Sequence, residues 1–378
     1  MVEMSRVPVE AIIADVPEDL KATGLVYASD EAPGITRRRH GKGFSFRDPD
    51  GSTVTDAETL TRIKRLVIPP AWTQVWISPD PMSHLQATGR DQKGRKQYRY
   101  HPSFSLHREV VKFEHLIEFG QVLPQIRQRA LADLRRHGLP REKVLACVVK
   151  LLETTLIRIG NEDYARENKS FGLTTLRTRH VAVEGAAIRF EFKGKSGKPW
   201  KLKVSDRRIA RVLRTIQELP GQRLFQYVDE DGVRQSIGSA DVNGYLKEIS
   251  GKDVTAKDFR TWAGTVQAAL ALAGVEYPET KTAVRKALKK AMDDVASRLG
   301  NTPTVCRKSY VHPEILSAFE EGSLALAVRE QAEMDSDATE RGELEDYEQA
   351  VLVFLRERME RAKAQEKDLI RAREEVAE

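Results

Sequence analysis

The chain has 378 residues, of which 40% are hydrophobic, and this length is enough for two or three domains with cores of their own. Its two cysteines, Cys147 and Cys306, lie far apart in the sequence, which argues against a disulfide scaffold or a cysteine-based metal site and indicates a reducing compartment. The N-terminal stretch lacks the layout of a signal peptide, and no apolar run is long enough to span a membrane. We therefore expect a soluble, cytoplasmic protein without a membrane partner.

Charge is distributed unevenly along the chain. The net charge is +6, but residues 329–378 contain nine basic and sixteen acidic side chains, so that the preceding residues carry +13. A basic body with an acidic tail is typical of a protein that binds a polyanion such as a nucleic acid. The alternative is that the lysines and arginines only solvate the surface.

The first hundred residues have the pattern of strands and turns. "GFSFRDPDGSTV" alternates before a turn signal, "RLVIPPAWTQVWIS" is split by two prolines as in an irregular or edge strand, and "GRKQYRYHP" alternates polar and aromatic residues. We predict a small β-rich domain over residues 1–104.

Helical spacing follows in "REVVKFEHLIEFGQVLPQIRQRALADLRRHG" and "REKVLACVVKLLETTLIRIG", and "IRFEFKGKSGKPWKLKV" predicts a β-hairpin among the helices. We predict an α+β fold, with a mainly helical domain over residues 105–322 and a charged, acidic helical tail over residues 323–378. An apolar stripe should dock the tail, consisting of Leu344, Tyr347, Val351, Phe354 and Leu355.

No stretch matches a phosphate-cradling glycine-rich loop, a metalloprotease motif or carboxylates at ligand spacing, so we predict no cofactor, nucleotide or metal. If the partner is a phosphodiester, side chains alone must supply a nucleophile, cations for the nonbridging oxygens and a proton donor for the leaving group. The stretches "TLIRIG", "EFKGKSGKPW", "AKDFRTWAGT" and "GNTPTVCRKSY" contain residues of these types, namely Arg158, Lys195, Lys257, Arg260, Asn301 and Tyr310.

Each of these residues also has a purely structural interpretation. Asn301 or Thr302 can cap a helix that begins at Pro303. Lys195 can be an ordinary turn residue, and Arg260 can pair with a nearby carboxylate.

The order of these residues resembles that of the type IB DNA topoisomerases, specifically the small poxvirus-type and bacterial enzymes. The blocks "GRDQKGRKQYRY", "RENKSFGLTTLRTRHV", "KDFRTWAGT" and "GNTPTVCRKSY" carry the resemblance. It implies a fold of the topoisomerase IB and tyrosine recombinase type, in which a β-rich front and a helical body clamp duplex DNA. It also implies a nucleoid-associated monomer that relaxes supercoiled DNA through transient single-strand cleavage, without ATP or metal.

The resemblance assigns a role to each residue of the set. Tyr310 stands at the position of the nucleophile, which forms a 3′-phosphotyrosyl link and frees a 5′-hydroxyl. Arg158 and Arg260 stand where two arginines hold the nonbridging oxygens, a task that suits the planar, permanently charged guanidinium. Lys195 stands where a hairpin lysine protonates the departing 5′ oxygen, and Lys257 where a second lysine assists it.

Further positions match DNA contacts of the family or depart from its pattern. Asn301 stands where the poxvirus enzymes have histidine, and an amide can donate a hydrogen bond but cannot be cationic. Asn161 and Asp163 replace lysines of those enzymes, which leaves the preferred DNA sequence open. The resemblance implies DNA contacts for Arg95, Lys96, Gln97, Tyr98, Tyr100 and Tyr164.

Two other functions are considered. A tyrosine recombinase shares the covalent chemistry, but that family has His-x-x-Arg where this sequence has Lys257-x-x-Arg260. A non-catalytic DNA-binding protein would not need the tyrosine, the hairpin lysine and both arginines in that order. His312 lies outside the matched pattern, and we interpret it as structural or as a DNA contact.

Overall fold

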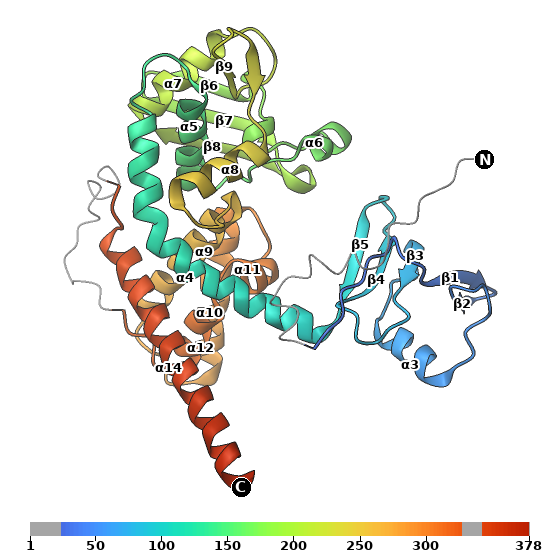
Figure 1. The fold of residues 1–378 in the computed structure, drawn as a ribbon. Coiled ribbons are helices and arrows are strands. Elements are labelled where there is room, and N and C mark those ends of the chain that lie inside the picture. Colours follow the sequence, from blue (N-terminus) through green and yellow to red (C-terminus); the bar gives the residue numbers. More distant parts are fainter. Residues whose placement is uncertain (1–23, 327–341, 378) are drawn as a thin grey trace, which may run out of the picture. The chain divides into compact units, whose positions relative to one another are not determined.

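The computed structural model describes residues 24–326 and 342–377 (Figure 1). The chain divides into two compact units, residues 1–113 and residues 114–378. The first unit is built on a β-sheet and the second is mainly helical, which confirms the predicted α+β class. The predicted boundaries at residues 104 and 322 stay a prediction.

The first unit contains an antiparallel five-stranded sheet with the strand order β2-β1-β3-β4-β5. Its strands are β1 (Ile35–His40), β2 (Gly43–Arg47), β3 (Thr73–Ile77), β4 (Leu85–Arg90) and β5 (Lys96–Tyr100). The core of this unit includes buried Ile35, Val75 and Ile77 from the strands, packed with Val54 and Ile63.

The stretch with two prolines was predicted to form an irregular or an edge strand. The strand is central, so the edge position is wrong, and the register shift between Thr73 and Trp76 agrees with an irregular strand. β3 begins only at Thr73 and pairs with β1 on one side and β4 on the other. Pro69 and Pro70 lie in the loop before it, where their missing N–H groups interrupt no ladder. Arg37 donates to the carbonyl oxygens of Pro69 at 3.1 Å and Trp72 at 2.6 Å, and so fixes this loop.

A short helix in the first unit was not expected from its pattern. α3 (Ala57–Arg65) begins after Asp56, whose side chain accepts a hydrogen bond from the Thr59 N–H at 2.7 Å. This N-cap is a recognisable helix signal within a region that otherwise has the composition of strands and turns.

The second unit packs helices around α5, whose residues 144–152 are almost all buried. α5 contacts α7, α8 and α9. The helices are α4 (Pro102–Asp133, which begins in the first unit), α5 (Arg141–Thr155), α6 (Glu162–Asn168), α7 (Arg207–Glu218), α8 (Ser239–Ser250), α9 (Ala256–Ala273), α10 (Lys281–Leu299), α11 (Pro303–Ser309), α12 (Pro313–Glu320) and α14 (Asp346–Ala377). Both cysteines are buried and free.

The predicted hairpin is present and belongs to a small sheet in the second unit. β7 (Ala187–Lys193) and β8 (Pro199–Ser205) pair along their full lengths, and β6 (Val181–Glu184) extends the sheet on the β7 side. A tight turn over Lys195–Gly197 joins β7 to β8. A second, short hairpin consists of β9 (Gln226–Val228) and β10 (Arg234–Ser236).

Helix α14 docks on the second unit through the predicted apolar stripe. Val351 and Leu355 are fully buried, and Leu344, Tyr347 and Phe354 are half-buried. Within the described ranges, no helix is long and apolar enough to cross a bilayer.

A buried carboxylate on α14 adds a polar connection that the sequence pattern did not predict. Glu348 accepts two hydrogen bonds from Arg127 of α4, at 2.8 and 3.0 Å, and one from the indole N–H of Trp262 of α9 at 3.0 Å. Arg127 also binds Glu153 of α5 at 2.5 Å. Because these charges are buried, removing one partner from such a network typically costs about 3–5 kcal/mol.

Candidate active site

Arg260 is the most deeply buried residue of the predicted set. It lies near the N-terminus of α9, which begins with a reciprocal cap in which Asp258 accepts from the Thr255 N–H at 2.8 Å. The Arg260 side chain is 2% exposed and donates to the carbonyl oxygens of Leu156 and, at 2.7 Å, Leu299. Its Nε atom is buried and has no hydrogen-bond partner in the described part of the chain.

Both carbonyl groups that hold Arg260 belong to helix C-termini. Leu156 caps α5 in the left-handed conformation with φ of 53°, and Leu299 is the last residue of α10. Helix C-termini carry partial negative charge, so they stabilise a guanidinium without neutralising it. The structural interpretation that pairs Arg260 with a carboxylate is therefore wrong. Asp258, the nearest in sequence, pairs with His115 at 3.4 Å.

Tyr310 ends α11, and its backbone is fastened to α9 next to Arg260. The Thr265 hydroxyl accepts from the His312 N–H at 3.0 Å and donates to the Tyr310 carbonyl oxygen at 3.4 Å. A Cβ atom built on Gly264 would lie 2.5 Å from that same oxygen, so only glycine permits this approach. The tyrosine is thereby held one turn away from Arg260.

The Tyr310 side chain is half-buried, and it lies near cations from helix α9 and from the segment that follows α5. The Arg260 guanidinium lies 5.2 Å from the centre of its ring. Burial alone would raise the pKa of Tyr310, but the positive charges of Arg260, Arg158 and Lys257 outweigh it and hold the pKa below its ordinary value. The site therefore makes the phenolate, which is the nucleophilic form, more accessible than in an ordinary tyrosine.

Arg158 lies beyond the end of α5 and not on it, which corrects the predicted location. The helix ends at Thr155, and the left-handed Leu156 turns the chain into an extended segment. The Arg158 carbonyl accepts from the Leu173 N–H at 2.9 Å, and a Cβ on Gly172 would lie 2.5 Å from the same oxygen. This close backbone contact fixes the main chain at Arg158 and therefore the direction of its Cα–Cβ bond.

Asn301 joins Arg158 and does not cap the following helix. Thr302 is the N-cap of α11, and its hydroxyl accepts from the Val305 N–H at 3.4 Å. The Asn301 side-chain oxygen instead accepts a short hydrogen bond from Arg158. Its Nδ2 atom is buried and has no partner within the described residues. The amide thus retains a free donor beside the arginine, suited to an incoming oxygen.

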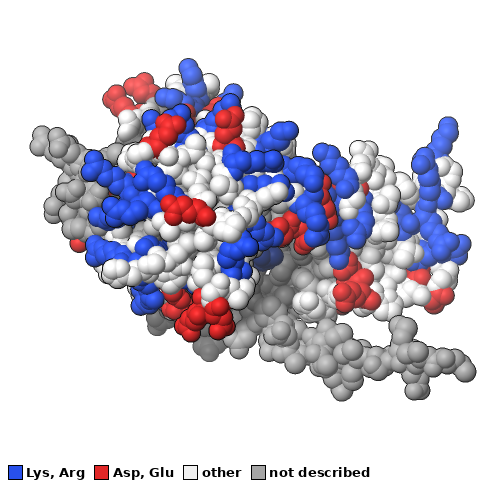
Figure 2. All heavy atoms as spheres, turned by 90° about the horizontal axis from the view of Figure 1, so that it is seen from above, with Lys and Arg blue, Asp and Glu red and all other residues white. Residues whose placement is uncertain are grey.

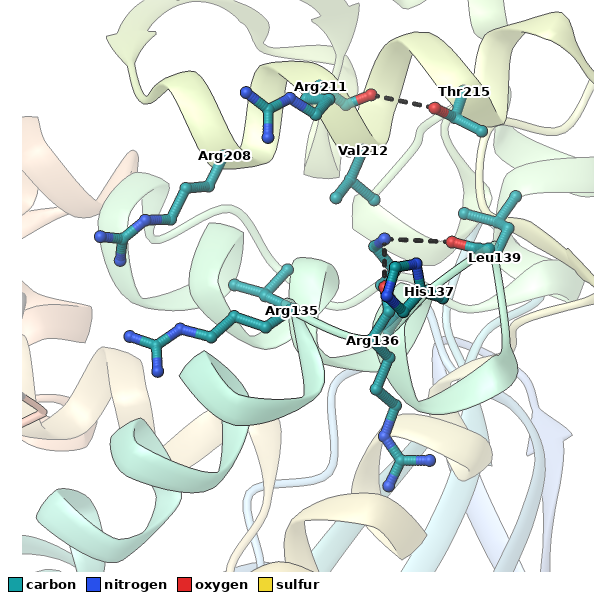
Figure 3. A pocket seen from close by; sticks show the side chains of 11 residues that line it. Arg135, Arg136, His137, Leu139, Arg208, Arg211, Val212 and Thr215 are labelled. Carbon is teal, nitrogen blue, oxygen red and sulfur yellow. Dashed lines mark hydrogen bonds between the residues drawn. The ribbon is translucent and has the colours of Figure 1, made fainter.

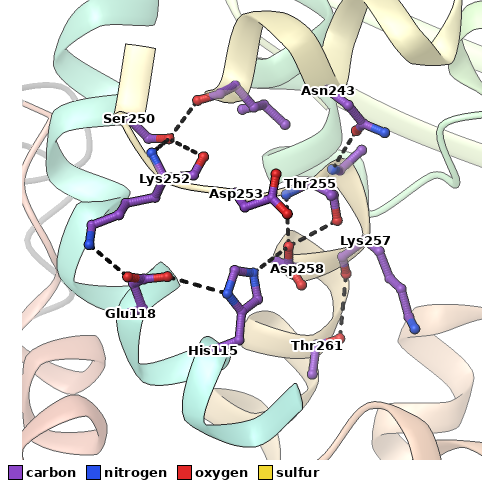
Figure 4. Close-up of polar contacts among 12 residues, drawn as sticks. His115, Glu118, Asn243, Ser250, Lys252, Asp253, Thr255, Lys257, Asp258 and Thr261 are labelled. Carbon is purple, nitrogen blue, oxygen red and sulfur yellow. Dashed lines mark hydrogen bonds and ion pairs between the residues drawn. The ribbon is translucent and has the colours of Figure 1, made fainter. Parts of the chain in front are cut away.

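Lys257 is exposed at the first turn of α9, and its neighbour Asp258 fixes that turn. Figure 4 shows the Lys257 side chain extending away from the contact between Asp258 and His115 of α4. The hydrogen bond to Asp258 raises the pKa of His115, so this link is a partly buried ion pair when the histidine is protonated. His115 also lies 3.4 Å from Glu118.

Lys195 occupies the exposed turn between β7 and β8. No described hydrogen bond or ion pair joins it to the other five residues of the set. The turn end of its hairpin is attached to the Arg158 region, because the Lys193 carbonyl accepts from the Phe171 N–H at 2.7 Å, next to Gly172. The structure therefore brings Tyr310, Arg260, Arg158 and Asn301 together and leaves Lys195 on the adjoining hairpin.

His312 is structural, in agreement with the first of its two interpretations. It is 1% exposed and caps α12, where its Nδ1 atom accepts from the Glu314 N–H at 3.1 Å. Since its side chain is buried, His312 does not present a base to solvent.

The predicted DNA contacts of the first unit lie on the edge strand β5. Tyr98 and Tyr100 are exposed on one face with their rings stacked 5.9 Å apart, and Lys96 lies over Tyr98 on that face. Gln97 points to the opposite face by the two-residue period and donates to Asp91 at 3.1 Å. Arg95 pairs with Asp91 at 2.7 Å.

The predicted DNA contact of the second unit, Tyr164, lies half-buried on the short helix α6. Asn161 is the N-cap of this helix and accepts from the Tyr164 N–H at 2.8 Å. Asp163 forms an exposed ion pair with Arg166 at 2.7 Å. The local negative charge of Asp163 is therefore partly offset.

Basic side chains also gather away from this constellation. Figure 2 shows that lysine and arginine predominate over acidic residues on the face in view. A hollow of about 420 Å³ lies between the end of α4 and α7, and Figure 3 shows Arg135, Arg208 and Arg211 extending toward the same side of it. These arginines are exposed, and none of the described lining groups is a buried polar atom without a partner. The hollow is therefore typical of a solvated basic surface.

Within the described ranges, no group of three or more His, Cys, Asp or Glu side chains could hold a metal ion. The main residues that sequence reasoning missed are Gly264, Thr265 and Gly172, which hold the backbones of Tyr310 and Arg158. Two of them lie in the quoted block "KDFRTWAGT" and one in "RENKSFGLTTLRTRHV", so the signal was present, but glycine and threonine carry no obvious chemistry.

Comparison with known proteins gives two family matches that together cover most of the chain. The profile described as "Eukaryotic DNA topoisomerase I, catalytic core" matches residues 95–336, and that described as "Bacterial DNA topoisomerase IB, N-terminal domain" matches residues 43–91. The chain is 33% identical to DNA topoisomerase 1B of Acanthamoeba polyphaga mimivirus over 294 residues, 76% of this chain and 88% of the relative. It is 24% identical to DNA topoisomerase 1B of Vaccinia virus (strain Copenhagen) over 250 residues, 65% of this chain and 75% of the relative.

Proposed function

The chain belongs to the type IB DNA topoisomerase family, and on that premise we propose that Tyr310 is the nucleophile that cleaves one strand of duplex DNA. The Tyr310 oxygen bonds to the phosphorus, the bond from phosphorus to the 5′ oxygen breaks, and the tyrosine proton passes to water. The product is a 3′-phosphotyrosyl link and a free 5′-hydroxyl. While this link persists, the cut strand rotates about its partner and relaxes supercoils, and the reverse attack reseals the strand.

The observation that carries the proposal is the convergence of Tyr310, Arg260 and Arg158 from segments far apart in the sequence. Arg260 and Arg158 supply fixed positive charge for the nonbridging oxygens, where charge develops in the transition state. Asn301 adds a donor from its unpartnered Nδ2 atom. Because helix C-termini hold Arg260 in advance, little reorganisation is needed when the phosphodiester arrives.

In this proposal Lys195 is the acid that protonates the leaving 5′ oxygen, and Lys257 assists through its charge near Tyr310. The exposed residues Tyr98, Tyr100 and Tyr164 supply contacts to the duplex. We expect the enzyme to act as a monomer on nucleoid DNA in the cytoplasm, without a nucleotide or a metal ion.

Relaxation of a supercoiled plasmid in the presence of chelator and without ATP tests the activity. We expect removal of both positive and negative supercoils, since torsion in the DNA drives the rotation. Strict dependence on ATP or magnesium would contradict the mechanism.

The Tyr310→Phe variant tests the assignment of the nucleophile. It should form no covalent adduct on a denaturing gel, while its affinity for duplex DNA stays close to that of the unaltered enzyme because phosphate contacts dominate binding. An adduct formed by Tyr310→Phe would assign the nucleophile to another residue.

A further inference from the structure

The indole ring of Trp200 on β8 fills the space between two glycines of the candidate active site. Gly194 precedes Lys195, and a Cβ atom built on it would lie 2.5 Å from Cδ1 of the indole. Gly300 precedes Asn301, and a Cβ atom built there would lie 2.8 Å from Cζ2 of the same ring. Atoms along the N–H edge of a single ring thus lie against both the lysine turn and the asparagine turn.

The two glycines are present for different reasons. Gly300 ends α10 with φ of 61°, a left-handed conformation that favours glycine whatever surrounds it. Gly194 is extended, with φ of −90°, so any residue could adopt its backbone conformation. Only the closeness of Trp200 excludes a side chain at Gly194.

Trp200 is itself fixed within the hairpin. It is the cross-strand partner of Phe192 on β7, and the two rings lie nearly parallel, at 7°, with their centres 6.2 Å apart. Phe192 is 6% exposed, so it cannot move aside freely. The Gly194 N–H also donates to the Lys198 carbonyl at 2.8 Å, and this hydrogen bond closes the turn that carries Lys195.

We propose that Trp200 is a positioning residue that docks the Lys195 turn against Gly300 and so sets the reach of the lysine toward the leaving 5′ oxygen. The inference rests on the proposed function. In the cleavage step the bond from phosphorus to the 5′ oxygen breaks, and the Lys195 ammonium gives its proton to that oxygen. Displacement of a reacting group by about 1 Å can lower the rate by about 10²-fold, so loss of the Trp200 indole should slow proton transfer from Lys195.

A substrate in which sulfur replaces the bridging 5′ oxygen separates positioning of the acid from every other structural effect. A thiolate leaves without protonation, so a misplaced Lys195 no longer limits its cleavage. We expect Trp200→Leu and Gly194→Ala to slow single-turnover cleavage of normal DNA by about 10²-fold. Both should cleave the sulfur substrate at close to the rate of the unaltered enzyme.

Control variants distinguish this inference from general damage. Gly244→Ala adds the same methyl group to helix α8 of the same unit, where the backbone is helical and a Cβ would have no neighbour within 4 Å, and it should cleave normally. Thermal unfolding reports whether Trp200→Leu folds. If it does not, Gly194→Ala, which keeps the indole and only crowds it, decides the question.

Lys195→Ala is the reference variant, since it should cleave the sulfur substrate at close to the rate of the unaltered enzyme. Two outcomes would contradict the role of Trp200 and leave the proposed function standing. In the first, sulfur rescues Lys195→Ala but not Gly194→Ala or the folded Trp200→Leu. In the second, Gly194→Ala and Trp200→Leu cleave normal DNA at the rate of the unaltered enzyme. If Lys195→Ala is not rescued, Lys195 is not the acid and both assignments fall.

Discussion

The two sides of the candidate active site are held in different ways. On the side of the tyrosine, buried Arg260 is bound by two helix C-termini, and the backbone of Tyr310 is fastened to the same helix through Thr265. On the side of the hairpin, Lys195 is exposed, and one indole ring connects its turn to the rest of the site. Arg260, one of the proposed charge-stabilising groups, is thus built into the core, whereas the proposed proton donor is carried on the surface of a small sheet.

This difference suits the chemistry of a reversible cut. Charge on the nonbridging oxygens must be stabilised in both directions, so rigid cations serve cleavage and resealing alike. The proton must be given to the 5′ oxygen during cleavage and taken back during resealing, which favours a group in contact with solvent.

The difference between the two sides is tested most directly by removing one proposed catalytic group from each side. Arg158→Ala should slow cleavage by about 10²–10³-fold, because a preorganised donor to developing charge is lost. Lys195→Ala should slow it by about 10²–10⁴-fold, because an acid is lost. Single-turnover cleavage of the sulfur substrate should rescue Lys195→Ala and leave Arg158→Ala slow. Equal rescue of both variants would abolish the distinction between the two sides.

A methyl group tests how rigid the tyrosine side is. In Gly264→Ala the new Cβ would meet the Tyr310 carbonyl at 2.5 Å, and backbone cannot give way as a flexible side chain can. We expect the displaced tyrosine to cleave about 10²-fold more slowly on both the oxygen and the sulfur substrate. Duplex affinity, measured by gel shift, should not change. Normal cleavage would show that this backbone contact is not needed.

The pH dependence of cleavage tests the charges around Tyr310. Its pKa is held below the ordinary value, so the rate should rise with pH and level off earlier than for an unperturbed tyrosine. Lys257→Met removes one of the positive charges, raises the pKa of Tyr310 and moves the rise to higher pH. A single-turnover pH–rate profile on the sulfur substrate, where proton donation does not limit the rate, gives the shift. An unmoved profile would mean that Lys257 does not act through Tyr310.

The smallest effect is expected from shortening α14 beyond its docked part. A chain that ends after Ala362 keeps Glu348 and the apolar stripe, and it should bind DNA with unchanged affinity, since residues 329–378 as a whole are acidic. A chain that ends after Glu340 loses Glu348 together with buried Val351 and Leu355, and its free energy of unfolding should fall by more than about 3 kcal/mol. Urea unfolding and salt-dependent DNA binding measure the two effects. A loss of affinity in the longer truncate, with folding intact, would assign a DNA contact to the acidic tail.

The sequence predicted those parts of the molecule whose signal is local. The hairpin, the long helices and the docking stripe follow from periodicity, and the candidate residues follow from short ordered blocks. The central position of β3 was missed because prolines in a preceding loop resemble prolines inside a strand. The helix α3 was missed because its N-cap, Asp56, lies in a turn-rich region.

The contacts that assemble the site could not be predicted from spacing. Arg260 binds carbonyl groups of residues 104 positions before it and 39 after it, and any main chain offers such acceptors. Trp200 and Gly300 lie a hundred positions apart, and nothing in either stretch indicates the other. In the sequence, Glu348 cannot be distinguished from the solvated carboxylates around it. Its burial depends on Arg127, a partner that the local sequence does not contain.

The bonds of Glu348 also bear on when the protein can become active during its synthesis. Trp262, on the same helix as Arg260, precedes Glu348 by 86 positions, and Arg127 precedes it by 221. Until α14 leaves the ribosome, the nascent chain contains every candidate catalytic residue but lacks one of the two carboxylates that bind Arg127. Since domains fold as units, we expect α9, the helix that carries Arg260, to complete its packing only after α14 has been synthesised.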